Sequence, residues 1–301
     1  MTQCQATRAA VGVAICLGTA GLVALWLPGD DTFSALKDPP LTFPRRQSIR
    51  LLVIVPTARE THRAQYVRDA YAMMKRNPTF CDMSGDCPFQ VRLIFVVGDP
   101  NAKTTSLTGD TLTVKAQDQD PDCRAASILV SSTTTKLLRA LRWAATCGDC
   151  YDYVMRQGDD AHVNLHNLFD KLATAPHTKW VLGRYIKNGP VEFPWLIKFL
   201  MIRVYPPYPY GMGWVMSTDV AEAIAALRMP KLSYPEDAIF GIWLLGMDVM
   251  YEDTHAFHNR RDRNIGGKIY RDLCRPTDIL THYMLPGDWE EINPIDFTVT
   301  C

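Results

Sequence analysis

Short, largely apolar runs alternate with helical patterns along most of this chain, and this alternation limits the fold more than any other feature. Ile49–Val55, Val91–Val97 and Tyr151–Met155 have the length and composition of buried strands. Shorter runs predict strands at Trp180–Leu182, Trp214–Met216 and Val249–Tyr251. Helices are predicted from Thr57 to about Arg76 and at Ser131–Ala145, Leu165–Ala173, Thr218–Leu227 and Asp237–Leu245. Strands that alternate with helices indicate an α/β fold with a mostly parallel sheet flanked by helices.

Three local signals refine this expectation. Thr57-Ala58-Arg59-Glu60 has the spacing of a capping box, so the first helix is expected to begin there. Asp99–Ala125 is rich in Asp, Thr and Pro, which predicts a loop region. Pro190–Pro209 is crowded with prolines and aromatic residues and predicts an irregular excursion.

Length and charge narrow the class of protein. The 301 residues are enough for one large domain or two small ones. The formal net charge is zero, so no global field favours nucleic acid or an anionic membrane surface as a partner.

The amino-terminal part predicts a membrane anchor. Ala9–Leu27 contains no charged residue and is long enough to cross a bilayer as a helix. Arg8 precedes this run, and Asp30 and Asp31 follow it, which favours a cytosolic amino end. We expect a cytosolic tail at 1–8, an uncleaved signal anchor at 9–27, a stem at 28–48 and a lumenal domain at 49–301. A cleaved signal peptide is the alternative, although the apolar part of such peptides is usually shorter.

Seven of the nine cysteines lie in the expected lumenal part, where an oxidising environment favours disulfides. Cys147 and Cys150 have the spacing of a redox motif, but they follow a helical pattern instead of opening one. A structural bridge between them, or two separate bridges, is therefore favoured over thiol chemistry.

Three polar features are candidates for chemistry, and each also has an ordinary structural explanation. Asp159 and Asp160 follow the third strand, where ligands of α/β sheets bind; they could hold a divalent metal or simply form a turn. Glu236 and Asp237 could supply a base, or only favour the first turn of a helix. His282 could complete a metal site or pack in the core.

These features, and their order along the chain, resemble those of glycosyltransferase family 31, the β-1,3-galactosyl- and N-acetylglucosaminyltransferases of the secretory pathway. The resemblance covers about Ile49 to Cys301. One departure is Gly158, which stands where the family usually has the first Asp of its triad. The matching blocks are Leu51–Tyr71, Thr133–Trp143, Val154–Leu165, Tyr205–Gly213, Pro235–Leu244 and Ile279–Ile292.

The resemblance implies a Rossmann-like GT-A fold, a Golgi membrane location as a single-pass type II protein, and a set of site residues. Asp237 is then the catalytic base, with Glu236 beside it to position an acceptor hydroxyl. Asp160 and His282 are the expected ligands of Mn²⁺, with Mg²⁺ as the alternative. The donor is expected to contact Asp159, Arg63, Arg68 and Lys136, and the acceptor to contact Tyr208 and Trp214.

The activity implied is a metal-dependent, inverting transfer of galactose from UDP-galactose to a hydroxyl of an acceptor glycan, forming a β-1,3 linkage. Three alternatives stay open. UDP-N-acetylglucosamine could be the donor, the chain could be a non-catalytic relative that acts as a chaperone or partner subunit, or it could be a different nucleotide-sugar enzyme on the same fold that forms another linkage. Gly158 is the feature that favours the second alternative, because it removes one carboxylate from the expected site.

Overall fold

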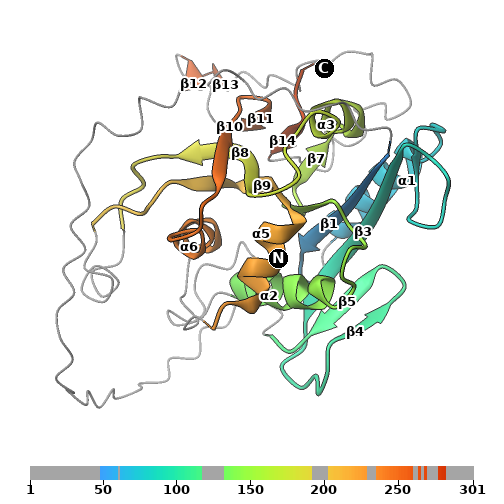
Figure 1. Ribbon diagram of the computed structural model, residues 1–301, viewed down its shortest axis with the longest axis horizontal. Coiled ribbons are helices and arrows are strands. Elements are labelled where there is room, and N and C mark those ends of the chain that lie inside the picture. Colours follow the sequence, from blue (N-terminus) through green and yellow to red (C-terminus); the bar gives the residue numbers. More distant parts are fainter. Residues whose placement is uncertain are drawn as a thin grey trace.

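The structure is a computed structural model that describes residues 48–59, 62–116, 132–191, 203–228, 235–259, 264–265, 268–269 and 277–282 (Figure 1). The predicted cytosolic tail and anchor, and the stem as far as residue 47, lie outside the described residues. Within the described part of the chain, no helix is long and apolar enough to cross a membrane.

A nine-stranded mixed sheet forms the centre of the fold (Figure 1). Its strand order is β10-β8-β9-β6-β1-β3-β5-β4, and β2 pairs with β3 beside this path. Five of its strand pairs are parallel and three are antiparallel, so the prediction of a mostly parallel sheet is confirmed. The strands are β1 (Ile49–Pro56), β2 (Phe80–Cys81), β3 (Phe89–Gly98), β4 (Ser106–Thr108), β5 (Thr111–Val114), β6 (Tyr153–Gln157), β8 (Trp180–Ile186), β9 (Tyr208–Ser217) and β10 (Met250–Asp253).

Helices cover both faces of this sheet, which confirms the predicted α/β class. Alternate side chains of β1 enter different cores, as the two-residue period of a strand requires. Leu51 and Val53 pack in the core that contains α1 and α3, whereas Leu52 and Ile54 pack in the core that contains α2, α5 and α6. The helices are α1 (Arg63–Met74), α2 (Ser132–Ala145), α3 (Leu165–Leu172), α5 (Thr218–Ala226) and α6 (Glu236–Trp243).

Two predictions about local structure are wrong. The first helix does not begin at a capping box: Thr57 follows β1 outside any helix, and α1 begins at Arg63 after His62. The segment Asp99–Ala125 is not all loop, because β4 and β5 form an antiparallel pair within it. Burial of Leu112 explains the pair, since the strand gives this polar segment an apolar side that faces the core.

A small three-stranded sheet brings the carboxyl-terminal part of the chain to the end of β6. Its strand order is β11-β14-β7, with β14 parallel to β11 and antiparallel to β7. In this register His282 lies opposite Ala161. The strands are β7 (Ala161–Val163), β11 (Phe257–Asn259) and β14 (Leu280–His282), and β12 (Asn264–Ile265) pairs with β13 (Lys268–Ile269) elsewhere.

Two disulfides are present among the described residues. Cys147 and Cys150 form the bridge that was one of the two alternatives for this pair, in the turn between α2 and β6. Cys81 and Cys87 form the other bridge, which joins the last residue of β2 to the segment before β3.

Candidate active site at the carboxyl ends of β1 and β6

The predicted acidic doublet lies in a tight turn between β6 and β7. The backbone N–H of Gly158 donates to the carbonyl of Met212 in β9 at 3.0 Å, and that of Ala161 donates to the carbonyl of Gly158 at 3.2 Å. These bonds hold Asp159 and Asp160 just beyond the carboxyl end of a central strand, which is where α/β sheets bind their ligands.

Asp159 is buried and is held by a residue that the sequence pattern assigned to another role. The hydroxyl of Thr57 donates to Oδ2 of Asp159 at 2.8 Å, so Thr57 supports the site instead of capping a helix. Nη1 of Arg63 lies 3.7 Å from Oδ1 of Asp159. Burial and the neighbouring charge of Asp160 raise the pKa of Asp159 to about 6, although the Thr57 hydrogen bond and the Arg63 charge oppose this shift.

The other two predicted donor-binding residues, Lys136 and Arg68, differ in their contacts. Lys136 is buried, and its Nζ donates to the carbonyl of Thr57 at 2.7 Å, which places it directly behind the acidic turn. Arg68 instead forms an ion pair with Asp110, with Nε 2.6 Å from Oδ2, and its guanidinium lies 4.1 Å from the centre of the Phe95 ring. The structure thus brings Arg63 and Lys136 to the acidic turn and gives Arg68 partners of its own.

Asp160 and His282 meet, as expected from the sequence. Nε2 of His282 lies 3.2 Å from Oδ1 of Asp160, and the ring of Tyr210 lies 6.4 Å from the His282 ring. Burial acts to raise the pKa of Asp160, but the contact with His282 and the charges of Arg63 and Arg156 lower it below the usual value.

The separation of these two atoms fits a shared metal ion. Around a six-coordinate ion with bonds of about 2.1 Å, neighbouring ligand atoms lie about 3 Å apart. A carboxylate with an imidazole is also a donor set that Mn²⁺ accepts. Asp160 and His282 would supply two of its ligands, and the described residues contain no group of three or more His, Cys, Asp and Glu side chains that could hold a metal.

The second acidic pair begins α6. Oδ1 of Asp237 accepts a hydrogen bond from the backbone N–H of Ala238 at 2.9 Å. Oδ2 faces β9 so closely that a Cβ atom on Gly211 would lie 3.2 Å from it. Burial and the neighbouring charge of Glu236 raise the pKa of Asp237 to about 6, against the effects of the Ala238 hydrogen bond and the Arg156 charge.

Arg156 joins the second acidic pair to β6, and the sequence patterns did not identify it. Its Nη2 lies 2.7 Å from Oε2 of Glu236, and both side chains are almost fully buried. Nη1 donates to the carbonyl of Gly211. One signal was available in the sequence, because a charged residue inside a buried strand has to have a partner.

The two predicted acceptor-binding residues lie on β9. Trp214 has no exposed surface: its ring lies 4.6 Å from that of Phe240, and the guanidinium of Arg156 lies 5.2 Å from its centre. Trp214 is thus fully buried among the described residues, and its contact with an acceptor stays a prediction. Tyr208 is nearly buried, and its ring lies 5.9 Å from the ring of Tyr205.

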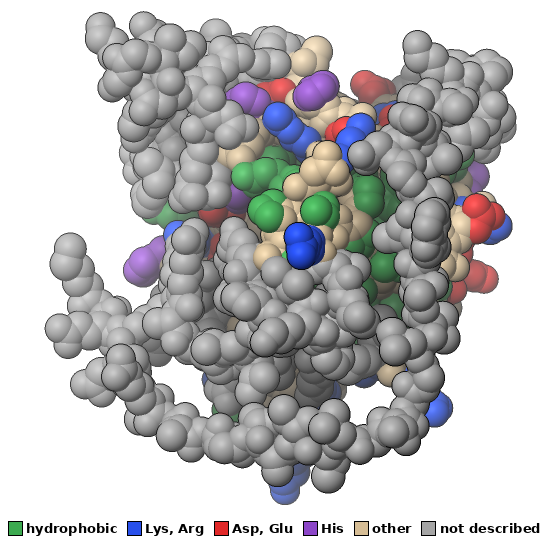
Figure 2. Space-filling view, turned by 90° about the vertical axis from the view of Figure 1, so that its left-hand side faces the viewer, with side chains coloured by type: hydrophobic (Ala, Val, Ile, Leu, Met, Phe, Trp, Pro, Cys, Tyr) green, Lys and Arg blue, Asp and Glu red, His purple; other side chains and the backbone are tan. Residues whose placement is uncertain are grey.

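One face of the molecule combines charged and apolar groups. Figure 2 shows His, acidic and basic side chains close together above a group of hydrophobic side chains.

Comparisons with known proteins identify the family of the chain. The family model described as Galactosyltransferase matches residues 62–255, more than half of the chain. Beta-1,3-galactosyltransferase 1 of Mus musculus and of Homo sapiens are each 31% identical over 170 residues, which cover 53% of this chain and 50% of theirs. Beta-1,3-galactosyltransferase GALT1 of Arabidopsis thaliana is 26% identical over 51% of this chain and 25% of its own. The chain thus matches about half, or less, of the length of these relatives.

Solved structures cover more of the chain, but at low TM-scores and low sequence identity. A galactosyltransferase, LgtC, in complex with donor and acceptor sugar analogs gives a TM-score of 0.40 at 14% identity, over 82% of this chain and 94% of that one. Mouse xyloside xylosyltransferase 1 gives 0.39 at 11% identity, over 78% and 97%. Scores of this size add nothing to the assignment, which rests on the family model. The chain belongs to the galactosyltransferase family, glycosyltransferase family 31.

Proposed function

We propose that this protein is a hexosyltransferase that moves galactose from UDP-galactose to a hydroxyl of an acceptor glycan, forming a β-1,3 linkage with inversion. Membership of the galactosyltransferase family supports the type of reaction. The similarity to proteins called beta-1,3-galactosyltransferases supports the sugar and the linkage.

One observation carries the proposal: β9 contacts both acidic pairs. Its Met212 carbonyl holds the turn after β6 that carries Asp159 and Asp160, and its Gly211 lies close to the carboxylate of Asp237 in α6. A transferase needs one group that accepts a proton and another that binds the charged leaving group. The two pairs are suited to these two tasks.

Asp237 acts as the general base. An acceptor hydroxyl is a poor nucleophile near neutral pH, so its proton has to leave as the oxygen attacks. The pKa of Asp237 is raised to about 6, which leaves it ionised at pH 7 and more basic than an ordinary carboxylate. The acceptor oxygen bonds to the anomeric carbon, the bond to the diphosphate oxygen breaks, and the proton passes to Asp237.

Asp160 and His282 would hold Mn²⁺ or Mg²⁺ together with the donor. When bound, such an ion supplies Lewis acidity that stabilises the negative charge of the departing diphosphate. Asp159 and Arg63 lie next to each other, and they would contact the donor. Substrate oxygens and water would complete the coordination.

The test is a donor screen with the purified full-length chain and Mn²⁺, in which release of UDP from UDP-galactose, UDP-N-acetylglucosamine and other UDP-sugars is measured with and without glycan acceptors. We expect UDP release from UDP-galactose that depends on Mn²⁺ and that, with acceptor present, is at least about a hundredfold slower in Asp237→Asn. Release of UDP from UDP-N-acetylglucosamine alone would identify this sugar nucleotide as the donor instead of UDP-galactose. No release from any UDP-sugar would favour the non-catalytic alternative.

We also propose that the protein is a single-pass type II protein of the Golgi membrane, anchored by Ala9–Leu27, with residues 49–301 in the lumen. The charge-free length of this segment and the position of Arg8 support the anchor. Amino-terminal sequencing of the protein extracted from membranes should find the anchor still attached. A mature chain that starts near residue 28 would show a cleaved signal peptide instead.

A further inference from the structure

Arg156 is a buried cation at the meeting point of three elements. It lies on β6, two residues before Gly158 and three before Asp159. From there its Nη2 and Nε atoms reach both carboxylate oxygens of Glu236, at 2.7 and 3.4 Å. Its Nη1 donates to the carbonyl of Gly211 in β9. One guanidinium thus ties β6 to β9 and to the first residue of α6.

The cost of burying such a pair indicates more than a stabilising role. Both side chains of the Arg156–Glu236 pair are only 8% exposed. Removing two charges from water is expensive, and well-packed apolar side chains of similar volume often stabilise a protein as well or better. A buried ion pair is therefore weak evidence for stability. Its geometry, however, fixes the groups that it joins.

The groups joined in this way are the two acidic pairs of the candidate site. Glu236, which Arg156 holds, is followed directly by Asp237, and Gly211 lies against the carboxylate of Asp237. The charge of Arg156 also acts on Asp159, Asp160 and Asp237, and it lowers the pKa of each. Arg156 therefore contacts the Glu236–Asp237 pair directly through Glu236 and acts on the Asp159–Asp160 pair through its charge.

We propose that Arg156 is a positioning residue that sets the place of the Asp237 base relative to the Asp159–Asp160 turn, by holding Glu236 and the Gly211 carbonyl with one fixed guanidinium. This inference rests on the proposed function, because it gives Asp237 the role of base. Glu236 then acts through its ion pair with Arg156.

Lysine cannot reproduce this arrangement. The guanidinium is planar and presents its donors in a rigid fork, whereas the ammonium of lysine is a point charge on a flexible stem. Arg156→Lys keeps the positive charge and loses the simultaneous hold on Glu236 and Gly211. The substitution therefore tests the fixed positions of the hydrogen-bond donors of Arg156 while its positive charge is kept.

The experiment compares Arg156→Lys with the double variant Arg156→Met/Glu236→Gln, which leaves no unpaired buried charge. We measure kcat and KM for transfer, Mn²⁺ affinity by electron paramagnetic resonance, melting temperature, and the titration of the Asp237 carboxyl by ¹³C NMR. We expect kcat to fall by roughly ten- to a hundredfold in both variants. In Arg156→Lys, Mn²⁺ affinity and the KM for the donor should change much less than kcat, because the Asp160–His282 pair is untouched and a positive charge is kept near the acidic turn.

The Asp237 titration has a predicted direction. Among the described residues, the charges that act on Asp237 are Glu236 in its own helix and Arg156 in β6, and the adjacent part of β9 is the uncharged Gly211. In Arg156→Lys the cation is no longer fixed beside this helix. The titration midpoint of Asp237 should therefore move to higher pH, and the acidic limb of the kcat profile should move with it.

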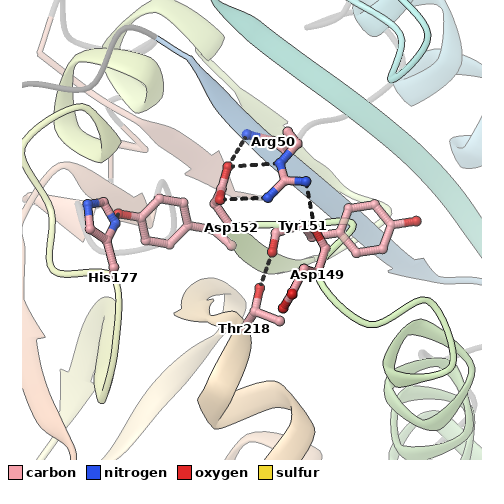
Figure 3. Close-up of polar contacts among 7 residues, drawn as sticks. Arg50, Asp149, Tyr151, Asp152, His177 and Thr218 are labelled. Atoms are coloured by element: carbon pink, nitrogen blue, oxygen red, sulfur yellow. Dashed lines mark hydrogen bonds and ion pairs between the residues drawn. The ribbon is translucent and has the colours of Figure 1, made fainter.

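Arg50 provides a control, since it forms an Arg–Asp pair at the start of β1 (Figure 3). Its Nη2 lies 3.1 Å from Oδ1 of Asp152, and its Nη1 donates to the carbonyl of Asp149 at 2.6 Å. This Arg–Asp pair joins β1 to the start of β6 and is far along both strands from the acidic turn. Arg50→Lys should lower the melting temperature and leave kcat and the Asp237 titration unchanged.

Each outcome decides the inference. If Arg156→Lys and the double variant behave like Arg50→Lys, with lower melting temperatures and unchanged kcat, Arg156 is structural and the inference is wrong. If Arg156→Lys does not fold, kcat of the double variant decides. If the wild-type protein transfers no sugar, the proposed function fails separately, and the Asp237 titration in Arg156→Lys still decides whether Arg156 sets the surroundings of that carboxyl.

Discussion

Nε2 of His282 lies 3.2 Å from Oδ1 of Asp160, although the two residues are far apart in the sequence. The register of β14 against β7 produces this contact, because it places His282 opposite Ala161, the residue after Asp160. The backbone pairing of two short strands thus determines whether a carboxylate and an imidazole can share an ion.

The first prediction concerns this pair as metal ligands. Asp160→Asn keeps the shape of the side chain and removes its charge, and His282→Gln removes the imidazole. Each change should weaken Mn²⁺ binding by at least about tenfold, measured by electron paramagnetic resonance of free Mn²⁺. Asp110→Asn is the control, since its carboxylate pairs with Arg68. Wild-type Mn²⁺ affinity in both site variants would place the metal elsewhere.

The second prediction uses two glycines that touch different carboxylates. A Cβ atom on Gly158 would lie 2.9 Å from Oδ1 of Asp160, whereas one on Gly211 would lie 3.2 Å from Oδ2 of Asp237. Gly158→Ala should therefore displace Asp160 and weaken Mn²⁺ binding. Gly211→Ala should crowd Asp237 and lower kcat while Mn²⁺ affinity stays at the wild-type value.

Each glycine variant is the control for the other. Replacing Gly by Ala also removes freedom from the unfolded chain, which stabilises by about 0.4–1 kcal/mol where the backbone allows Ala. Melting temperatures should therefore change little in either variant. Equal loss of Mn²⁺ affinity in both would indicate general damage to the site and contradict the separation into a metal side and a base side.

The sequence predicted the acidic turn because its position depends on local rules. A buried strand that ends in two acidic residues places both carboxylates at the carboxyl edge of an α/β sheet, and Asp159 and Asp160 lie there. The partners of these residues depend on distant contacts. Thr57 has the spacing of a helix cap, yet its hydroxyl binds Asp159, 102 residues later in the chain. No local pattern reveals such a choice.

Arg156 and Trp214 are two further residues whose surroundings the sequence did not predict. A charge in an apolar strand signals that a partner is needed, but the partner, Glu236, begins a helix on another part of the chain. The resemblance to the family gives Trp214 an acceptor contact, and the sequence did not indicate that its side chain is fully buried. Burial is a property of the assembled sheet, so composition alone does not assign it.

The third prediction tests the packing role of Trp214. Its ring has no exposed surface and lies against Phe240. Trp214→Ala should lower the free energy of unfolding by about 3–5 kcal/mol, as measured by urea denaturation, because the cavity cannot fully collapse. Trp214→Phe should cost less and leave the KM for the acceptor unchanged. A raised acceptor KM in Trp214→Phe at normal stability would return this ring to the acceptor site.

The last prediction concerns Asp237, through both rate and stability. Because a base has to be ionised and the pKa of Asp237 is about 6, kcat should fall as the pH is lowered through 6. Asp237→Asn keeps the shape of the side chain and removes the proton acceptor. Transfer should fall by about a hundred- to ten-thousandfold, and Mn²⁺ binding should persist.

The stability of the same variant has a sign that can be worked out. The pKa of Asp237 is higher in the folded protein than in the unfolded chain, so the folded state binds more protons between about pH 4 and 6. The contribution of Asp237 to stability is therefore present below pH 4 and is lost as the pH rises to 6. Asp237→Asn removes this dependence and should make the protein more stable at pH 7, by roughly 1–3 kcal/mol.

A helix-capping role predicts the opposite result. If Asp237 only favoured the start of α6, through its charge and its bond to the Ala238 N–H, the variant would lose about 0.3–1 kcal/mol and keep its rate. Transfer rate and free energy of unfolding, measured at pH 5 and pH 7 on one preparation, separate the two roles. If Asp237→Asn is slower but more stable at pH 7, Asp237 is a general base whose burial raises its pKa and lowers the stability of the fold.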